Sequence, residues 1–317
     1  MAEALQCYAA AIQAAERGSE RAVMAESLRR SGIVQHGRSQ PALARELCEQ
    51  SHNIAMDIGD RVLAAEALNA LAGFDLESGS MHAARERFDE ALELGGSSEH
   101  LRGRIEQNLG ILANIHGDSS QAMAHYRESL LSFERVGEDR GCAIAYHNLG
   151  MVSADCEQWD DADRYFRLSL SIARTIGDIH LEALGLLNRA EVHLAQRDYE
   201  QARHNAESAL GMFDQLGSQL DKADAYRVIG RAYRETGRYP LAESRLRSAM
   251  ELAVSSGSIL TEAEAAREMA LLYQAMGRGH EGLAYLHVAR TLFGRLDARL
   301  DLVDVSTRIN ELEESLA

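Results

Sequence analysis

The chain repeats itself about every 40 residues, and no other feature of the sequence constrains its fold as strongly. A small residue recurs at 40-residue intervals with a single step of 38, a larger side chain follows four residues later, and a second small residue follows three after that. Spacings of four and three share one face of a helix, so each unit is predicted to contain a helix with a small–large–small face for close packing. The columns are Ala4, Ala44, Ala84, Ala122, Ala162, Ala202, Ala242 and Gly282; Tyr8, Cys48, Phe88, Tyr126, Phe166, Ala206, Leu246 and Leu286; and Ala11, Ser51, Ala91, Ser129, Ser169, Ala209, Ala249 and Ala289.

Another helix precedes this one in each unit and has a small residue at its centre. A glycine inside a helix costs about 1 kcal/mol relative to alanine. Its repeated use therefore predicts that a neighbouring helix packs too closely for a larger side chain. The central residues are Gly32, Ala72, Gly110, Gly150, Ala190, Gly230 and Ala270.

Short polar segments separate the helices and carry residues that end and begin helices. Ile58–Asp60 and Ile176–Asp178 both read Ile-Gly-Asp, in which glycine suits a left-handed C-cap and aspartate an N-cap. Pro41 and Pro240 fall in the first turn of a predicted helix, where the missing N–H costs little. We therefore predict an all-α fold in which each unit is a helical hairpin.

Composition agrees with helices and narrows the classes of function. The 317 residues are 46% hydrophobic, with two prolines and one tryptophan, which favours helices over strands. No apolar run approaches the roughly 20 residues that cross a bilayer, and the N-terminus lacks the apolar core of a signal peptide. We expect a cytoplasmic protein with no membrane partner. The net charge of −16 would repel phosphate backbones, so we also expect no nucleic acid partner.

The order of the columns resembles the tetratricopeptide repeat. Asn148–Leu170 reads NLGMVSADCEQWDDADRYFRLSL, and Trp159, Tyr199 and Tyr239 occupy the family's aromatic position after the turn. The family's usual period is 34 residues. The 40-residue variant is similar to Leu-Gly-Asn-type G-protein modulators, kinesin light chains and bacterial regulators with long helical repeats. The resemblance implies a right-handed superhelical solenoid of antiparallel helix pairs, each touching mainly its neighbours.

This architecture predicts one array over residues 1–317, with unequal ends. The N-terminal helix lacks its partner and would expose Leu5, Tyr8 and Ile12, so we expect either further chain upstream or self-association of two copies through this end. The predicted segments are a half repeat at 1–17, repeats at 20–59, 60–97, 98–137, 138–177, 178–217, 218–257 and 258–297, and a capping helix at 298–317.

The resemblance also implies where a ligand lies, because in this family the first helices of the hairpins line a concave face that holds peptides. Asn108, Asn148 and Asn188 recur on that lining at intervals of 40. A row of carboxamides can bond the main chain of a peptide whatever its side chains are. The alternative is that each asparagine only bonds a neighbouring helix, and we favour the groove.

Other positions of the same lining differ along the chain. Near its middle stand Gln107, His147 and Met151, which suit polar contacts and an apolar anchor. Towards the C-terminus stand Arg227, Arg231 and Arg267, which predict an acidic ligand.

The arginines could equally form ion pairs within the protein instead of binding a ligand. Asp224 precedes Arg227 by three residues and Glu235 follows Arg231 by four, which is close enough for ordinary ion pairs along one helix.

Catalytic and metal-binding patterns find no support in the sequence. His147, or His116 with His125, stands outside any catalytic or phosphate-binding motif, and Asp160-Asp161 complements the start of a helix. The cysteines, Cys7, Cys48, Cys142 and Cys156, have no metal-ligand spacing and are read as core or surface residues. We predict neither an enzyme nor a bound cofactor or metal.

The sequence therefore predicts a scaffold that binds a protein or peptide segment in the groove. The alternative is a sensory or regulatory input domain of a larger bacterial signalling protein. Ala289–Val305 is similar to the junction by which bacterial repeat arrays lead into HD-type phosphohydrolase domains that degrade cyclic dinucleotides. In that case the array would act by oligomerising or by controlling the catalytic domain.

Overall fold

The computed structural model describes residues 2–296 and 298–316, so the predicted bounds at residues 1, 297 and 317 lie outside it. Over the described residues the chain forms helices and no strand, which confirms the all-α class. None of these helices is long and apolar enough to cross a membrane. The helices are α1 (Ala2–Gly18), α2 (Arg21–His36), α3 (Pro41–Asp57), α4 (Arg61–Glu77), α5 (Met81–Gly95), α6 (Glu99–Ile115), α7 (Ser119–Val136), α8 (Asp139–Asp155), α9 (Trp159–Ile176), α10 (Ile179–Ala195), α11 (Tyr199–Leu216), α12 (Gln219–Glu235), α13 (Tyr239–Ser256), α14 (Ile259–Ala275), α15 (Gly279–Arg295) and α16 (Arg299–Leu316).

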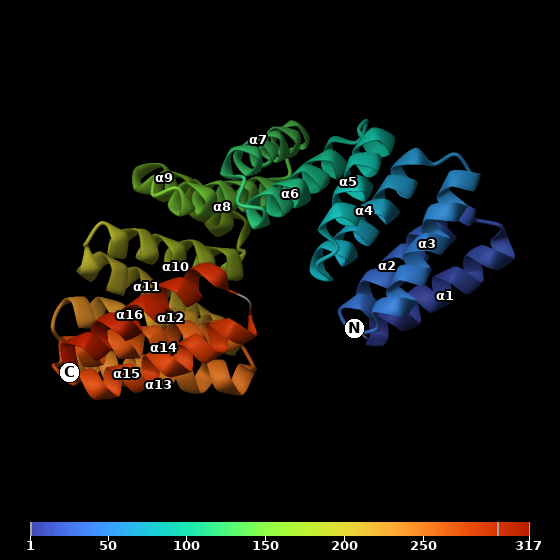
Figure 1. Ribbon diagram of the computed structural model, residues 1–317. Helices are drawn as coiled ribbons and strands as arrows, with labels where there is room; N and C mark the ends of the chain where they lie inside the picture. The colour runs from blue at the N-terminus through green and yellow to red at the C-terminus, as the bar shows by residue number, and fades with distance from the viewer. Residues whose placement is uncertain (1, 297, 317) are drawn as a thin grey trace. The chain divides into compact units, whose positions relative to one another are not determined.

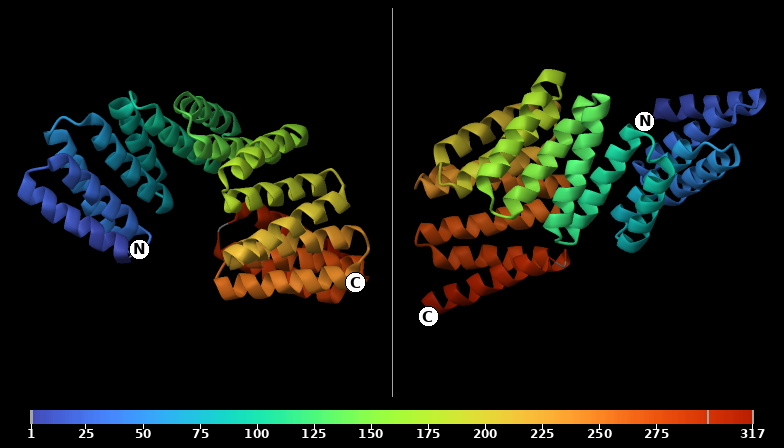
Figure 2. Two further views of the ribbon diagram at one scale, coloured as in Figure 1. Left: turned by 180° about the vertical axis from the view of Figure 1, so that it is seen from behind. Right: turned by 90° about the horizontal axis from the view of Figure 1, so that it is seen from above.

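The chain divides by its internal contacts into two compact units, a first unit up to Val152 and a second unit from Ser153. Hairpins pack one on the next within each unit: α2–α3, α4–α5 and α6–α7 in the first, and α10–α11, α12–α13 and α14–α15 in the second (Figures 1 and 2). This stacking is the solenoid of hairpins that the period predicts. The single continuous array over residues 1–317 stays a prediction.

The central glycines lie where the second helix of the hairpin comes too close for a side chain. A Cβ added to Gly110 of α6 would lie 2.5 Å from the Tyr126 ring of α7. A Cβ added to Gly230 of α12 would lie 2.6 Å from Cγ of Leu246 in α13. Both neighbours belong to the large-residue column, so the predicted reason for the glycines is confirmed.

The helices also begin and end at the capping residues that the sequence predicts. Gly177 ends α9 in the left-handed region with a φ of 71°. The side chains of Asp60 and Asp178 accept hydrogen bonds from backbone N–H groups in the first turns of α4 and α10. Pro41 and Pro240 stand in the first turns of α3 and α13. Caps of this kind set the length of each helix, and hence the register of the predicted lining residues.

The terminal helices are covered on one side only. Leu5, Tyr8 and Ile12 of α1 are half-buried, and α1 packs against α2. The inward face of α16 contributes Val305, Ile309 and Leu312 to the core of the second unit.

The outward face of α16 is less polar than a capping helix predicts. Glu311, Glu313 and Glu314 are exposed, as expected. Leu300 is 88% exposed and Val303 is 67% exposed, so this face combines apolar and acidic side chains.

Candidate functional site

A cavity of about 300 Å³ lies in the first unit, among α4, α6, α7 and the start of α8. We call it the amide cavity, because it is lined by Asn69 of α4 together with Gln107 and Asn108 of α6. Three of these elements, α4, α6 and α8, are first helices of hairpins, which is the face predicted to hold a ligand. The other lining residues are His100, Arg104, Phe133, Glu138, Arg140, Gly141 and Ile144.

Two of the carboxamides join neighbouring first helices. Nδ2 of Asn108 donates a hydrogen bond to Oδ1 of Asn69 at 3.0 Å. Asn69 is buried and Asn108 half-buried. Each carboxamide has two N–H donors and an oxygen with two lone pairs, so one shared bond uses only part of the bonding capacity of the pair. Asn108 therefore braces two helices, and the same pair has the chemistry to bond a ligand.

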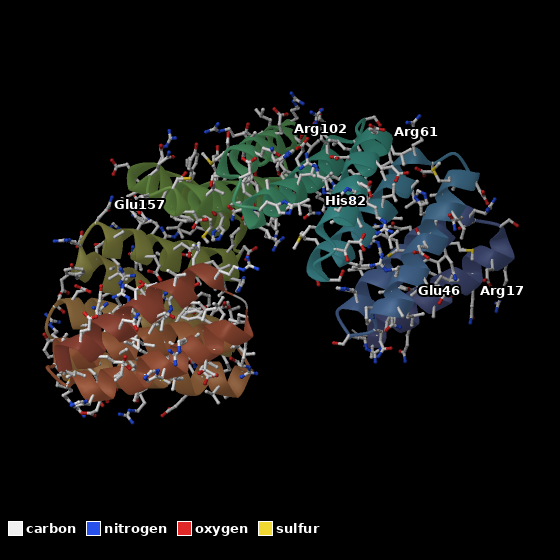
Figure 3. The ribbon with its side chains drawn as sticks, in the orientation of Figure 1. Arg17, Glu46, Arg61, His82, Arg102 and Glu157 are labelled. Atoms are coloured by element: carbon white, nitrogen blue, oxygen red, sulfur yellow. The ribbon has the colours of Figure 1, made fainter. Side chains whose placement is uncertain are left out.

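Two arginines bring positive charge to the amide cavity. Arg104 is 36% exposed, and its Nη1 lies 3.9 Å from Oε1 of Glu66. Arg140 lies in the first turn of α8. Arg102 (Figure 3) occupies the α7 side of α6 instead, where its Nη2 lies 3.6 Å from Oε2 of Glu128. The cavity thus offers amide groups for a peptide main chain and guanidinium groups for a carboxylate.

The predicted lining residues are brought together only in part. Gln107 and Asn108 meet in the amide cavity. His147 and Asn148 are half-buried further along α8, and Met151 is 39% exposed one turn later. Asn188 lies on α10 in the second unit. A continuous row of the three predicted asparagines therefore stays a prediction.

In the second unit, the predicted arginines contact carboxylates from neighbouring helices. Nη2 of Arg227 lies 3.0 Å from Oε1 of Glu191, and its Nε lies 3.4 Å from Oε2 of Glu264 and 3.8 Å from Oδ1 of Asp224. Arg231 Nη1 lies 3.7 Å from Oε2 of Glu191. One guanidinium, that of Arg227, is therefore shared among three carboxylates.

The remaining arginine of this set faces α16. Nη1 of Arg267 lies 2.7 Å from Oδ1 of Asp301 and 3.9 Å from Oδ2 of Asp304. Glu235, expected beside Arg231, contacts Arg234 at 3.0 Å. These contacts match the ion-pair interpretation of the arginines, and the acidic ligand stays a prediction.

The shortage of positive charge around Arg227 affects Asp224. Burial raises the pKa of Asp224 to about 6, and the nearby carboxylates of Glu264, Asp221 and Glu191 act in the same direction. Arg227 lowers this pKa but does not outweigh them. The surroundings of Asp224 on the first helices of the second unit therefore favour an additional positive charge or a bound proton.

A model of the tetratricopeptide repeat matches residues 141–215 and 181–253, which contain α9 to α12 and reach into α8 and α13. The stacked hairpins and close-packed columns over the rest of the described chain have the same form. The chain therefore contains tetratricopeptide repeats, which confirms the resemblance seen in the sequence.

Similar proteins share this fold at low sequence identity. The Tonsoku-like protein of Bos taurus is 26% identical over 143 residues, which cover 41% of this chain and 10% of that protein. This chain therefore spans about a tenth of the length of the Tonsoku-like protein.

Solved structures match over a larger share of the chain. A signal transduction ATPase with numerous domains from Pyrococcus horikoshii, which has a tetratricopeptide repeat sensor, matches with a TM-score of 0.67 and 14% identity, over 99% of this chain and 54% of that one. A Rap protein complexed with competence and sporulation factor matches with a TM-score of 0.63 and 12% identity, over 99% of this chain and 98% of that one.

Some of the side chains that could suggest chemistry have structural roles instead. Nδ1 of His125 lies 2.8 Å from Oε2 of the buried Glu106. Burial raises the pKa of the Cys48 thiol to about 12 and that of Cys142 to about 11, which keeps both thiols protonated and unreactive. Within residues 2–296 and 298–316, no group of three His, Cys, Asp or Glu side chains is arranged to hold a metal.

Sequence reasoning missed several residues of the amide cavity. Arg104 stands three residues before Gln107, and Arg140 stands seven before His147, so both share the face of a predicted lining residue. Extending the lining towards the start of the helix by one turn in α6 and by two turns in α8 would have found them. Asn69 was not missed, because it precedes the central Ala72 by three residues, as Gln107 precedes Gly110, and that offset places it on the predicted lining.

Proposed function

We propose that this tetratricopeptide repeat protein is an interaction scaffold that binds an extended peptide segment of a partner protein in the amide cavity. The observation that carries this proposal is the gathering of Asn69, Gln107 and Asn108 in one cavity with Arg104 and Arg140 beside them. Amide groups can pair with the main chain of an extended peptide, and arginine can pair with a carboxylate. The proposed ligand is therefore held by its backbone, with an acidic side chain or C-terminus at the arginine end.

Similar folds give this proposal a precedent. The Rap protein that matches this chain was solved in complex with competence and sporulation factor, so a comparable stack of hairpins can hold a ligand. No catalytic group is needed for this role, and we propose a non-enzymatic scaffold.

The experiment begins with a peptide library displayed on phage and selected against the full chain. The selected peptides are synthesised, and their dissociation constants are measured by fluorescence anisotropy for the wild type and for Asn108→Ala and Gln107→Ala. Each variant is expected to weaken binding by about tenfold, because a lost hydrogen bond to a ligand costs about 1–1.5 kcal/mol.

The matched control is Asn53→Ala, which removes an exposed asparagine from α3 in the same unit. It should leave every dissociation constant within about twofold, since surface changes away from a site cost little. Selected peptides that bind the Asn108→Ala and Gln107→Ala variants as tightly as the wild type would overturn the proposal.

A regulatory input domain is the second candidate. The match to the Pyrococcus horikoshii protein favours it, because there a similar fold is the tetratricopeptide repeat sensor within a longer signalling chain. The test is to read the coding sequence that follows codon 317. A frame that continues into a catalytic domain, such as an HD-type phosphohydrolase, supports this candidate, and an immediate stop codon contradicts that arrangement.

A further inference from the structure

Three exposed leucines form a row on the first helices of the second unit. Leu220, Leu260 and Leu300 stand at intervals of 40 residues in the first turns of α12, α14 and α16. They are 42%, 49% and 88% exposed. We call them the leucine row.

The three helices that carry the leucine row are neighbours on one face. Arg227 of α12 reaches Glu264 of α14 at 3.4 Å, and Arg267 of α14 reaches Asp301 of α16 at 2.7 Å. The leucines occupy equivalent positions on these helices. The row therefore runs across the helix axes, with a spacing of about 10 Å set by the packing of neighbouring helices.

A second row lies one helical turn from the leucines. Asp224, Glu264 and Asp304 each follow a leucine of the row by four residues, which places them on the same face. Their side chains are 29%, 26% and 39% exposed. We call them the carboxylate row.

Two members of the carboxylate row, Asp224 and Glu264, are incompletely neutralised by the protein itself, whereas Asp304 also has Arg308, whose Nε lies 2.9 Å from its Oδ2. Arg227 forms ion pairs with Asp224 and Glu264, and it also contacts Glu191. The raised pKa of Asp224 is the expected result of burial beside too many carboxylates. Carboxylates also outnumber basic side chains on α14 and on α16. A cation supplied from outside would improve the electrostatics of this face, and an anion would worsen them.

We propose that the leucine row and the carboxylate row together form a second docking surface, which takes a basic amphipathic helix of a partner protein. Seven residues of an α-helix rise about 10 Å, so apolar side chains seven apart on the partner match the spacing of the leucines. Lysines or arginines on the flank of that apolar stripe face the carboxylates. No residue of the amide cavity takes part in this second surface.

The test uses the full chain and a designed helical peptide with leucines at a spacing of seven and lysines along one flank. Binding is measured by fluorescence anisotropy at low and at physiological salt. We expect Leu260→Ser and Glu264→Gln each to weaken binding at least tenfold, and added salt to weaken it further. The control Leu241→Ser removes a leucine of similar exposure, 46%, from the second helix α13, and should change the dissociation constant by less than twofold.

Two further comparisons decide between this surface and others. A peptide with glutamates in place of the lysines should bind at least tenfold more weakly, and Asn108→Ala should leave binding of the lysine peptide unchanged. Equal or tighter binding of the glutamate peptide would overturn the proposal. So would a lysine peptide that fails to bind, or one that Leu241→Ser or Asn108→Ala affects as much as Leu260→Ser does.

Discussion

The first helices α4 and α6 of the first unit differ in polar chemistry from α12 and α14 of the second unit, although all four share one backbone frame. At one position of the repeat, α4 and α6 carry Asn69 and Gln107, whereas α12 and α14 carry Arg227 and Arg267. The neutral residues line a cavity with a hydrogen-bonded amide pair, and the arginines contact carboxylates of adjacent helices. The difference shows that the small–large–small columns fix the packing, while the lining positions can change their chemistry from one hairpin to the next.

Two carboxylates on first helices, Asp75 and Asp224, differ in how well the protein neutralises them. Asp75 of α4 is 5% exposed and contacts two arginines, with Nη2 of Arg45 at 2.7 Å from its Oδ1 and Arg87 on its other oxygen. Asp224 of α12 has only a share of Arg227, at 3.8 Å. One carboxylate is well neutralised and the other is not, which predicts opposite effects when each is removed.

The largest expected effect is at Asp75. We expect Asp75→Ala to lower the free energy of unfolding by about 3–5 kcal/mol, because it leaves two arginines without their buried partner. Urea unfolding followed by circular dichroism measures the change. The control is Asp57→Ala, whose carboxylate is 65% exposed and should cost less than about 1 kcal/mol. An equal loss of unfolding free energy in Asp75→Ala and Asp57→Ala would show that the two arginine contacts of Asp75 contribute no more than an exposed ion pair.

Gly110 tests whether the columns fix the packing. Gly110→Ala places a methyl group against the Tyr126 ring, and we expect a loss of about 1–3 kcal/mol despite the better helix propensity of alanine. A Cβ at Gly73 in α4 meets nothing within 4 Å, so Gly73→Ala should stabilise the protein by about 0.5–1 kcal/mol. Thermal unfolding of both variants checks this pair. A stabilising Gly110→Ala would show that the helices are not closely packed there.

Removing the carboxylate of Asp224 should raise the free energy of unfolding, whereas removing that of Asp75 lowers it, and the effect at Asp224 should depend on pH. Its pKa of about 6 in the folded state lies above the value of 3.8 for a free side chain, so the folded state binds the extra proton. The contribution of Asp224 to stability therefore falls as the pH rises from about 4 to about 6, and stays low at higher pH.

Asp224→Asn removes this penalty. We expect the variant to be more stable than the wild type by about 1–2 kcal/mol at pH 7, below the full linkage value because the side chain is partly exposed and Arg227 loses a partner. The difference should vanish below about pH 4. Urea unfolding across this pH range measures it, and a variant that is less stable at pH 7 would show that Arg227 neutralises Asp224 adequately.

The smallest effect concerns a turn of the second unit. Arg197, between α10 and α11, has a φ of 63°, whereas Gly237 and Gly277 occupy the corresponding turns of the next hairpins. Arg197→Gly relieves the left-handed strain and should stabilise the protein by up to about 1 kcal/mol. A small rise in melting temperature is expected, and a fall would show that the Arg197 side chain has contacts worth more than the strain.

The fold could be predicted because its determinants recur in the sequence. Gly110, Tyr126 and the caps at Asp60 and Asp178 each belong to a local pattern or to a column, and the period repeats that information along the chain. Capping residues then set where each helix ends, and the small residues of the columns let neighbouring helices pack closely, so both could be predicted from the sequence.

The site could be predicted only in part, because its contacts run between helices. The pair of Asp224 with Arg227 lies on one helix and was readable from a spacing of three. The partners Glu191 and Glu264 come from α10 and α14, and Asn108 bonds Asn69 from a different column of the repeat. Such contacts depend on the offset and rotation between neighbouring hairpins, which a spacing within one chain segment does not encode.

Hydrogen exchange of the full chain, with and without a peptide selected from the library, tests the central claim most directly. Binding in the amide cavity predicts slower exchange of backbone amides in the first helices α4, α6 and α8, with the second helices α3 and α5 little changed. Protection confined to α3, α5 and α7 would place the ligand on the second helices, and would contradict recognition by Asn69, Gln107 and Asn108.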